Sequence, residues 1–267
     1  MSCFAAAPMG SPSMWLKYCE CSWDDMALYD LPATVEHVLS VTQQPTLAYV
    51  GHSEGTTQAF AGFSRNQTLA SRVSLFVALA PVAFVHSQTS PVFTLLADLS
   101  VAELFQTFGL REFLANGSMI NKIAPEICHL LPTGCDIAIF LFCGPTRHEN
   151  ATRLPVYISK TPGTYDYVRG MFACVVARNF CVRACVRVRT GACADAFARA
   201  RACAAGTSVK NMEHWTQQIK HETFQMYDYG SAAANIEKYG SATPPPYNLH
   251  DMTVRTALFT GVLSCLP

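Results

Sequence analysis

The sequence predicts an α/β fold, in which hydrophobic strands alternate with amphipathic helices. Two short apolar runs, residues 47–50 and 73–79, are typical of buried parallel strands, and a helix-compatible segment at residues 56–63 lies between them. The order strand, helix, strand with short connections is that of a doubly wound sheet. The chain has 267 residues, 50% of them hydrophobic, which is enough to bury one large core.

Two helices are expected before the first strand. Ser22 followed by Asp24 and Asp25 makes a capping-box-like start, because a hydroxyl accepts hydrogen bonds from early N–H groups and acids suit the first turn. A second helix is expected to begin at Asp30, with Pro32 in its first turn. We expect its buried stripe to consist of Val35, Val38, Leu39 and Val41.

The pentapeptide Gly-His-Ser-Glu-Gly between the first strand and the following helix is the most informative motif. Gly51 and Gly55 leave room for strand and helix to approach closely, and Ser53 would occupy a strained turn between them, a nucleophile elbow. Ser53 Oγ is therefore the candidate nucleophile. The backbone N–H of Glu54 would supply half of an oxyanion hole, and His52 is expected to support the turn.

Charge and hydropathy exclude some classes of protein. Lys and Arg together number 19, as do Asp and Glu, so we expect no nucleic-acid partner and no electrostatic membrane anchor. The longest apolar stretch, residues 73–85, contains Pro81 and is too short for a transmembrane segment. Residues 1–21 do not resemble a secretory signal, yet three glycosylation acceptor patterns favour a secretory protein. These candidates are Asn66, Asn116 and Asn150.

The sequence pattern of the second half of the chain differs from that of the first half. Short helical patterns, at residues 91–99, 101–108 and 211–220, replace the strands until a last strand at residues 254–259. A helical block inserted after a core strand is expected to form a cap over the carboxyl edge of the sheet, where ligands of open α/β sheets bind. The predicted cap spans residues 85–250.

A set of short motifs runs through the chain in a fixed order. They are Ser-Trp-Asp-Asp-Met-Ala at 22–27, Val-Gly-His-Ser at 50–53, Ala-Leu-Ala-Pro-Val-Ala at 78–83, Asn-Met at 211–212, His-Trp-Thr-Gln at 214–217, Tyr-Asp-Tyr-Gly at 227–230 and Pro-Pro-Tyr at 245–247. Together these motifs resemble the acid lipases, the α/β-hydrolase family that includes gastric lipase and lysosomal acid lipase. The resemblance covers most of residues 22–162 and 205–261.

The resemblance implies an α/β-hydrolase with a helical cap, which cleaves triacylglycerols or sterol esters through a Ser–Asp–His triad without a metal or organic cofactor. Ser53 matches the family nucleophile, and Glu54 stands where glutamine is usual. Cys128 and Cys135 lie where the family has a cap disulfide. Lipid ester substrates, a lipid–water interface and a secreted or lysosomal location are further implications of the resemblance.

The chain departs from the family pattern in three places. Residues 1–21 resemble nothing in it, and the early strands with the loop that supplies a second oxyanion donor are missing. Residues 163–204 interrupt a continuous family stretch. After Gly261 the pattern stops before the loops that carry the triad aspartate and histidine. We therefore expect a partial hydrolase core in residues 22–84, a truncated strand and tail in residues 251–267, and impaired activity.

The interrupting segment, residues 163–204, is rich in Cys, Val, Arg and Ala. Its cysteines include Cys181, Cys185, Cys193 and Cys203. Their spacing matches no standard zinc pattern and no histidine lies among them, so we expect no metal site. Because the repeating nucleotides TGCGTGCGTGCG encode Cys-Val-Arg-Ala, we interpret the segment as translated intron or an equivalent gene-model error, and we expect it to be poorly packed or disordered.

No other residues replace the triad convincingly. Asp228 and His250 have the right chain order, but neither ends a predicted core strand. We expect His214 to pack its ring or form a hydrogen bond within the cap. Without a base, Ser53 is a weakly nucleophilic alcohol. The alternatives to a lipase are therefore a non-catalytic lipid-binding pseudoenzyme, a non-functional truncated product, or an esterase or thioesterase for small soluble esters.

Overall fold

The computed structural model describes residues 21–99 and 207–261, together with a few residues between them. Its main sheet contains three parallel strands, β1 (Leu47–His52), β2 (Val73–Leu79) and β7 (Thr256–Phe259), with β2 in the middle. The predicted α/β class with a parallel sheet is confirmed. The strands at residues 47–50, 73–79 and 254–259 are also confirmed, with small differences at their ends.

The other described strands are short and pair in antiparallel fashion. β4 (Val176–Ala177) pairs with β1 and with β5 (Phe180–Cys181), so that the sheet order is β5-β4-β1-β2-β7. A separate two-stranded sheet joins β3 (Glu112–Phe113) to β6 (Thr207–Ser208). The three parallel strands therefore form the sheet that carries the core.

One continuous helical run precedes β1, where the sequence predicted two separate helices. It consists of α2 (Trp23–Asp25), the π-helical turn η1 (Met26–Asp30) and α3 (Leu31–Thr42). The predicted capping box is present, since the Ser22 N–H donates to Asp25 Oδ2 at 3.0 Å. Pro32 has no N–H to donate, and the wider π turn just before it lets the helix continue through that gap. The predicted helix start at Asp30 with Pro32 in the first turn is confirmed, because Asp30 is the N-cap of α3, but η1 joins α3 to α2 without a break.

The buried stripe of α3 contains three of the four residues that we expected. Val35, Val38 and Leu39 are buried, but Val41 is 67% exposed. At 3.6 residues per turn, Val41 lies about 120° around the helix from Val35, whereas Thr42 returns to the same side. Thr42 is accordingly half-buried, and including Val41 in the stripe was wrong.

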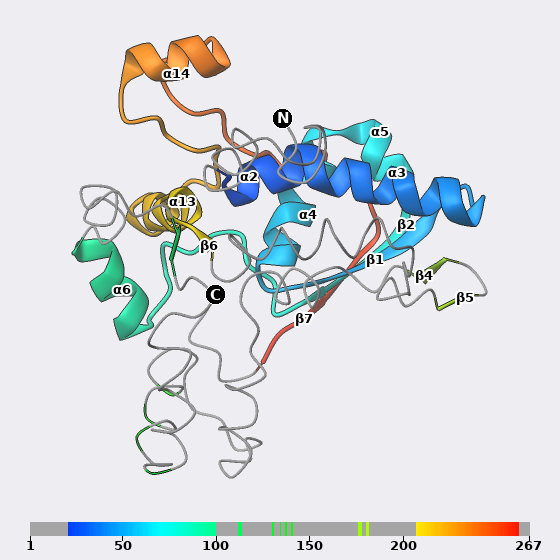
Figure 1. The fold of residues 1–267 in the computed structure, drawn as a ribbon, viewed down its shortest axis with the longest axis horizontal. Coiled ribbons are helices and arrows are strands. Elements are labelled where there is room, and N and C mark those ends of the chain that lie inside the picture. Colours follow the sequence, from blue (N-terminus) through cyan, green and yellow to red (C-terminus); the bar gives the residue numbers. More distant parts are fainter. Residues whose placement is uncertain are drawn as a thin grey trace, which may run out of the picture.

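The core lies between the sheet and the helices on one of its faces (Figure 1). α4 (Glu54–Arg65) follows β1 directly, and α5 (Gln67–Ser71) leads into β2. Phe60 and Phe63 of α4 pack edge-on against Phe76 of β2, with ring centroids 5.2 and 5.7 Å apart. Tyr49 of β1 packs against Phe63 at 5.6 Å. These aromatic contacts fix helix α4, and with it the elbow, against the sheet.

Strand β2 is buried on one face only. Phe76 and Ala78 are buried, whereas Leu75 and Leu79 are 38% and 37% exposed. Successive side chains of a strand point to opposite faces, and helices α3, α4 and α5 cover the Phe76 face (Figure 1). The expectation of a fully buried strand at residues 73–79 is therefore wrong.

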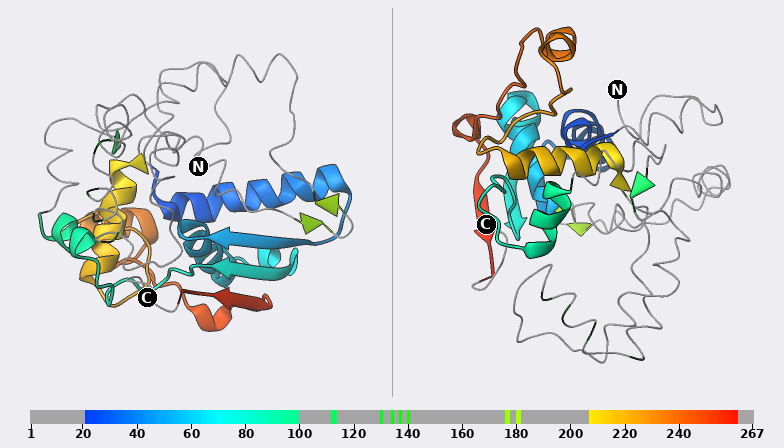
Figure 2. Two further views of the ribbon diagram at one scale, coloured as in Figure 1. Left: turned by 90° about the horizontal axis from the view of Figure 1, so that it is seen from below. Right: turned by 90° about the vertical axis from the view of Figure 1, so that its left-hand side faces the viewer.

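The remaining described helices follow β2 and precede β7. They are α6 (Pro91–Asp98), α13 (Val209–Lys220), α14 (Ala232–Tyr239) and the 3-10 turn η4 (Leu249–Asp251). α6 and α13 contact each other and lie beyond the carboxyl ends of β1 and β2 (Figure 2). The helices predicted at residues 91–99 and 211–220 are confirmed, whereas 101–108 lies outside the described residues.

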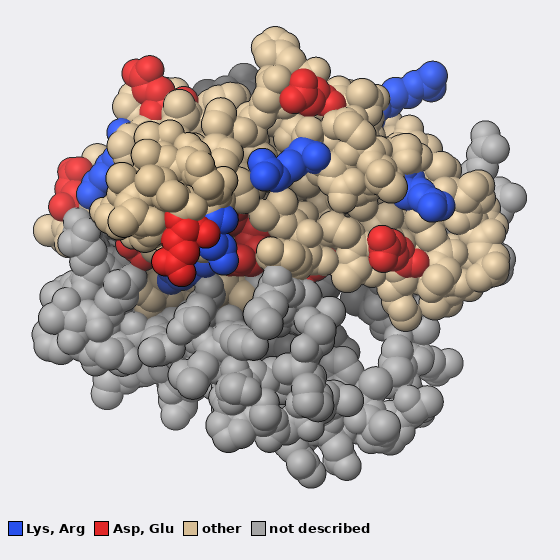
Figure 3. All heavy atoms as spheres, turned by 90° about the horizontal axis from the view of Figure 1, so that it is seen from above, with Lys and Arg blue, Asp and Glu red and all other residues tan. Residues whose placement is uncertain are grey.

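Several sequence expectations stay predictions. Residues 1–20 and nearly all of 163–204 lie outside the described residues, and the boundaries of the cap at 85–250 are untested. In the described ranges, no helix is both long and apolar enough to cross a membrane. On the face shown in Figure 3, the described Lys and Arg side chains are scattered among acidic ones rather than gathered in a patch.

Candidate functional site

Ser53 occupies the sharp turn between β1 and α4. Its φ is 52° and its ψ is −123°, a combination that residues with a side chain rarely adopt. The Ser53 N–H donates to the Leu79 carbonyl at 3.1 Å, and its own carbonyl accepts from the Thr56 N–H at 2.8 Å. Hydrogen bonds on both sides therefore hold this strained conformation, with the side chain half-buried at the carboxyl edge of the sheet.

The glycines of the motif allow strand and helix to come close together. A Cβ atom on Gly51 would lie 2.8 Å from the Gly55 carbonyl oxygen, which is closer than real Cβ atoms approach. The Tyr49 hydroxyl donates to that same oxygen at 3.0 Å. Burial raises the pKa of Tyr49, so the phenol stays neutral and remains a donor. The backbone on both sides of Ser53 is thus closely packed.

The first turn of α4 is also fastened to the chain that leaves β2. Thr57 Oγ1 donates to the Val82 carbonyl at 2.8 Å, and the Val82 N–H donates to Thr56 Oγ1 at 2.9 Å. Both threonines are fully buried. These bonds fix the helix N-terminus, whose dipole favours negative charge beside Ser53.

Comparisons with known proteins agree with this geometry. No family model matches the chain. It is 36% identical over 245 residues to the lysosomal acid lipase/cholesteryl ester hydrolases of Homo sapiens and Macaca fascicularis. It is also 36% identical over 244 residues to the gastric triacylglycerol lipase of Homo sapiens. The chain is similar to the acid lipases over about half of their length. The resemblance inferred from the motifs is therefore confirmed.

The extent of the match is uneven. The aligned region includes 90% of this chain but 50% of each of these relatives. Lipase member K of Mus musculus, 35% identical over 254 residues, gives a similar picture, with 94% of the chain and 52% of the relative aligned. The chain thus spans about half the length of the curated relatives that it matches.

Two of the described histidines, His52 and His214, bear on whether Ser53 has a base. His52 is exposed. His214 stacks on Trp23 with ring centroids 4.1 Å apart, and its Nε2 lies 3.1 Å from the Gln225 carbonyl. The prediction that His214 packs its ring and bonds locally is confirmed. In the described residues, no hydrogen bond joins Ser53 Oγ to an imidazole.

Asp228 and His250 are not joined to each other in the described structure. Asp228 Oδ1 accepts from the Gly230 N–H at 2.8 Å and from Asn235 Nδ2 at 3.0 Å. His250 is exposed in the 3-10 turn η4. These contacts shape the loop before α14.

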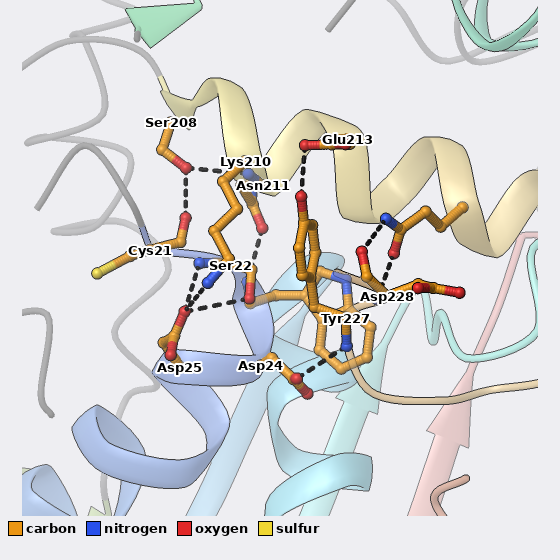
Figure 4. Close-up of polar contacts among 12 residues, drawn as sticks. Cys21, Ser22, Asp24, Asp25, Ser208, Lys210, Asn211, Glu213, Tyr227 and Asp228 are labelled. Carbon is orange, nitrogen blue, oxygen red and sulfur yellow. Dashed lines mark hydrogen bonds and ion pairs between the residues drawn. The ribbon is translucent and has the colours of Figure 1, made fainter. Parts of the chain in front are cut away.

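Two acids of helix α2, the buried Asp24 and the half-buried Asp25, join this helix to the segment from residue 207 onward (Figure 4). Asp24 Oδ2 accepts from the Tyr227 N–H at 3.1 Å, and Oδ1 accepts from the Tyr247 hydroxyl. Burial raises the pKa of Asp24 to about 6, and the two hydrogen bonds oppose that rise. Asp25 pairs with Lys210 Nζ at 3.1 Å. The polar face of α2 therefore fastens the second half of the chain to the first.

Sequence reasoning missed the role of the Glu54 side chain. Glu54 Oε2 accepts hydrogen bonds from Asn211 Nδ2 at 3.1 Å and from Trp215 Nε1 at 3.2 Å. Burial of the carboxyl group raises its pKa, and these hydrogen bonds act in the opposite direction. The only local signal was that two of the motifs, at 211–212 and 214–217, lie on one helix. No pattern in the sequence relates that helix to the elbow.

The remaining candidates from the sequence are the glycosylation sites and the disulfide cysteines. Asn66 is exposed and caps α5, with Oδ1 accepting from the Leu69 N–H at 2.9 Å. Asn116 and Asn150 lie outside the described residues, as do Cys128 and Cys135. Within the described ranges, no three His, Cys, Asp or Glu side chains gather in a way that would hold a metal.

Proposed function

We propose that this chain carries the nucleophile of a lipid ester hydrolase, and that Ser53 is that nucleophile. The observation that supports the proposal most directly is the backbone of Ser53, strained at φ 52° between a core strand and a helix N-terminus. Strain of this kind persists where the surrounding structure enforces it, and it is common at catalytic residues. Similarity to several lipases points to the same chemistry.

In this mechanism Ser53 Oγ attacks the ester carbonyl carbon while a general base takes the hydroxyl proton. The carbonyl oxygen becomes an oxyanion, for which the Glu54 N–H at the start of α4 provides one donor. Collapse of the intermediate breaks the bond to the alcohol, which leaves with the proton. Water then releases the acid from the acyl-serine and restores Ser53.

We infer that the substrate is an ester of a long acyl chain, either a triacylglycerol or a sterol ester. Two relatives are named for cholesteryl ester hydrolysis and another for triacylglycerol hydrolysis. Exposed apolar side chains follow β2 on the side of the elbow, with Phe84 50%, Leu95 56% and Leu99 62% exposed. Such side chains suit contact with a lipid–water interface. A secreted or lysosomal location, with a glycan on Asn66, is part of the same proposal.

A second candidate function is lipid binding without catalysis. It is favoured by one observation, that no imidazole bonds to Ser53 Oγ in the described residues. A serine without a base has little nucleophilicity. In that case the cap and the apolar side chains would serve to hold a lipid rather than to cleave it.

Hydrolysis of emulsified trioleoylglycerol, cholesteryl oleate and soluble 4-nitrophenyl acetate tests the proposal. The purified chain is compared with Ser53→Ala, which keeps the fold and removes the nucleophile. Turnover that is lost in Ser53→Ala and rises when the lipid forms an interface supports a lipase. Equal rates in both proteins contradict the role of Ser53. Absence of turnover together with lipid-dependent thermal stabilisation would favour the binding function instead.

A further inference from the structure

The side chain of Glu54 points away from its own helix to a second one. Glu54 is the first residue of α4, directly after Ser53. Its Oε2 accepts from Asn211 and Trp215, which lie 157 and 161 residues further along the chain. Asn211 and Trp215 are four residues apart on α13, so they lie on the same face of that helix. One carboxylate oxygen thus connects the elbow to a face of α13.

The Asn211 donor is held rigidly. The residue is only 1% exposed, and Oδ1 accepts from the Trp23 N–H at 2.7 Å. Nδ2 donates both to Glu54 and to Thr207 Oγ1 at 2.9 Å. A side-chain amide has two N–H donors, and both are used here. Asn211 therefore cannot move away from Glu54 without breaking bonds to α2 and β6.

The second donor reinforces the connection. The indole of Trp215 packs against Trp23, with ring centroids 6.0 Å apart, and its Nε1 donates to Glu54. Two donors from one face of α13 thus hold the Glu54 side chain.

The backbone of the same residue is the proposed oxyanion donor, so the two parts of Glu54 are coupled. We propose that Glu54 is a positioning residue, an inference that rests on the proposed function. Its carboxyl group ties helix α13 to the elbow, and it thereby sets the direction of the Glu54 N–H beside Ser53. An amide at this position accepts the same two hydrogen bonds, but alanine does not. Removal of the carboxyl group leaves the Asn211 and Trp215 donors without their shared acceptor. Helix α13 then has no hydrogen bond to the Glu54 side chain of the elbow.

The rate at which a fluorophosphonate labels Ser53 tests this role. Three substitutions are compared. Glu54→Ala removes the hydrogen bonds to Asn211 and Trp215, and Glu54→Gln keeps an acceptor for them. Trp215→Phe removes only the indole donor. Because small misplacements of reacting groups cost up to about 10²-fold, we expect Glu54→Ala to label on the order of tenfold to a hundredfold more slowly. Glu54→Gln should restore most of that loss, and Trp215→Phe should cost about threefold.

Gln67→Ala is the matched control. Gln67 bonds the Asp251 carbonyl at 2.9 Å and accepts from Thr253 Oγ1 at 3.1 Å, at the far end of α4. Loss of the Gln67 side chain should lower the melting temperature without slowing the fluorophosphonate labelling of Ser53. Labelling of Glu54→Ala at the unchanged rate, at a temperature where every variant is folded, would overturn the positioning role.

Hydrogen exchange of α13 separates this inference from the proposed function. Peptides covering residues 209–220 should exchange faster in Glu54→Ala than in Gln67→Ala. If the unsubstituted chain is not labelled at all, the proposed function fails, and the exchange result alone decides whether Glu54 positions α13. Equal exchange in the two variants would contradict that role in either case.

Discussion

The stack of His214 on Trp23 makes folding stability depend on pH in a way that one substitution can isolate. Since a carbonyl only accepts, His214 Nε2 carries the proton that it shares with Gln225, and Nδ1 is buried with no hydrogen-bond partner in the described structure. A second proton would have to enter at Nδ1, beside Trp23. Burial therefore lowers the pKa of His214 to about 3, from an ordinary value of 6.5.

The sign and size of the effect follow from that difference. Below pH 6.5 the unfolded chain binds the His214 proton and the folded chain does not, so stability falls as the pH drops. Because the unfolded histidine is only half protonated at pH 6.5, the loss from pH 7.0 to pH 4.5 is slightly less than two units at about 1.36 kcal/mol each, or about 2.6 kcal/mol. Replacement of His214 by Phe keeps an aromatic ring on Trp23 and removes the titration. The Gln225 carbonyl still accepts from Gln218 Nε2 at 3.0 Å.

Urea denaturation at pH 7.0, 5.5 and 4.5, followed by tryptophan fluorescence, measures the free energy of unfolding of both proteins. We expect the stability of His214→Phe relative to the unsubstituted chain to rise by about 2.6 kcal/mol between pH 7.0 and pH 4.5. The comparison cancels every other titrating group that the substitution leaves unchanged. A difference that stays constant across this range would refute the account of a buried neutral imidazole.

Two further substitutions test the elbow and the buried acid. Gly51→Ala should destabilise the chain by about 1–3 kcal/mol and abolish labelling of Ser53, because the new Cβ meets the Gly55 carbonyl at 2.8 Å. Gly261→Ala, where an added Cβ meets nothing within 4 Å, is its control in thermal melts. Asp24→Asn should be more stable than the unsubstituted chain above pH 6, by up to about 3 kcal/mol, and should show no such gain near pH 4. The reason is that the folded chain holds the Asp24 proton up to a pKa of about 6, so stability falls as the pH rises from about 4 to about 6. Denaturation at both pH values checks this, and a gain of equal size at pH 4 would contradict it.

The local features of the fold were predictable because they depend on neighbours in sequence. The apolar runs at residues 47–50 and 73–79 identify β1 and β2, and the glycines around Ser53 identify the turn between strand and helix. The capping box at Ser22 was found from its side chains in the same way. In each case a few adjacent residues determine the backbone conformation.

The errors have a common physical cause, which is that burial and helix continuity depend on distant packing. Local pattern did not show that Leu75 and Leu79 would be exposed on the uncovered face of β2, or that a π turn would carry the helix past Pro32. The bonds from Glu54 to Asn211 and Trp215 span more than 150 residues. Only the folded arrangement brings these groups together.

The central claim is that Ser53 is a strained, catalytically oriented serine, and covalent labelling tests it most directly. The chain is treated with a fluorophosphonate, and the adduct is located by mass spectrometry of the peptides. We expect one phosphonyl group on the peptide that contains Ser53 and none on Ser53→Ala or on the urea-unfolded chain. An unlabelled folded chain, or an adduct on a different serine, would contradict the claim.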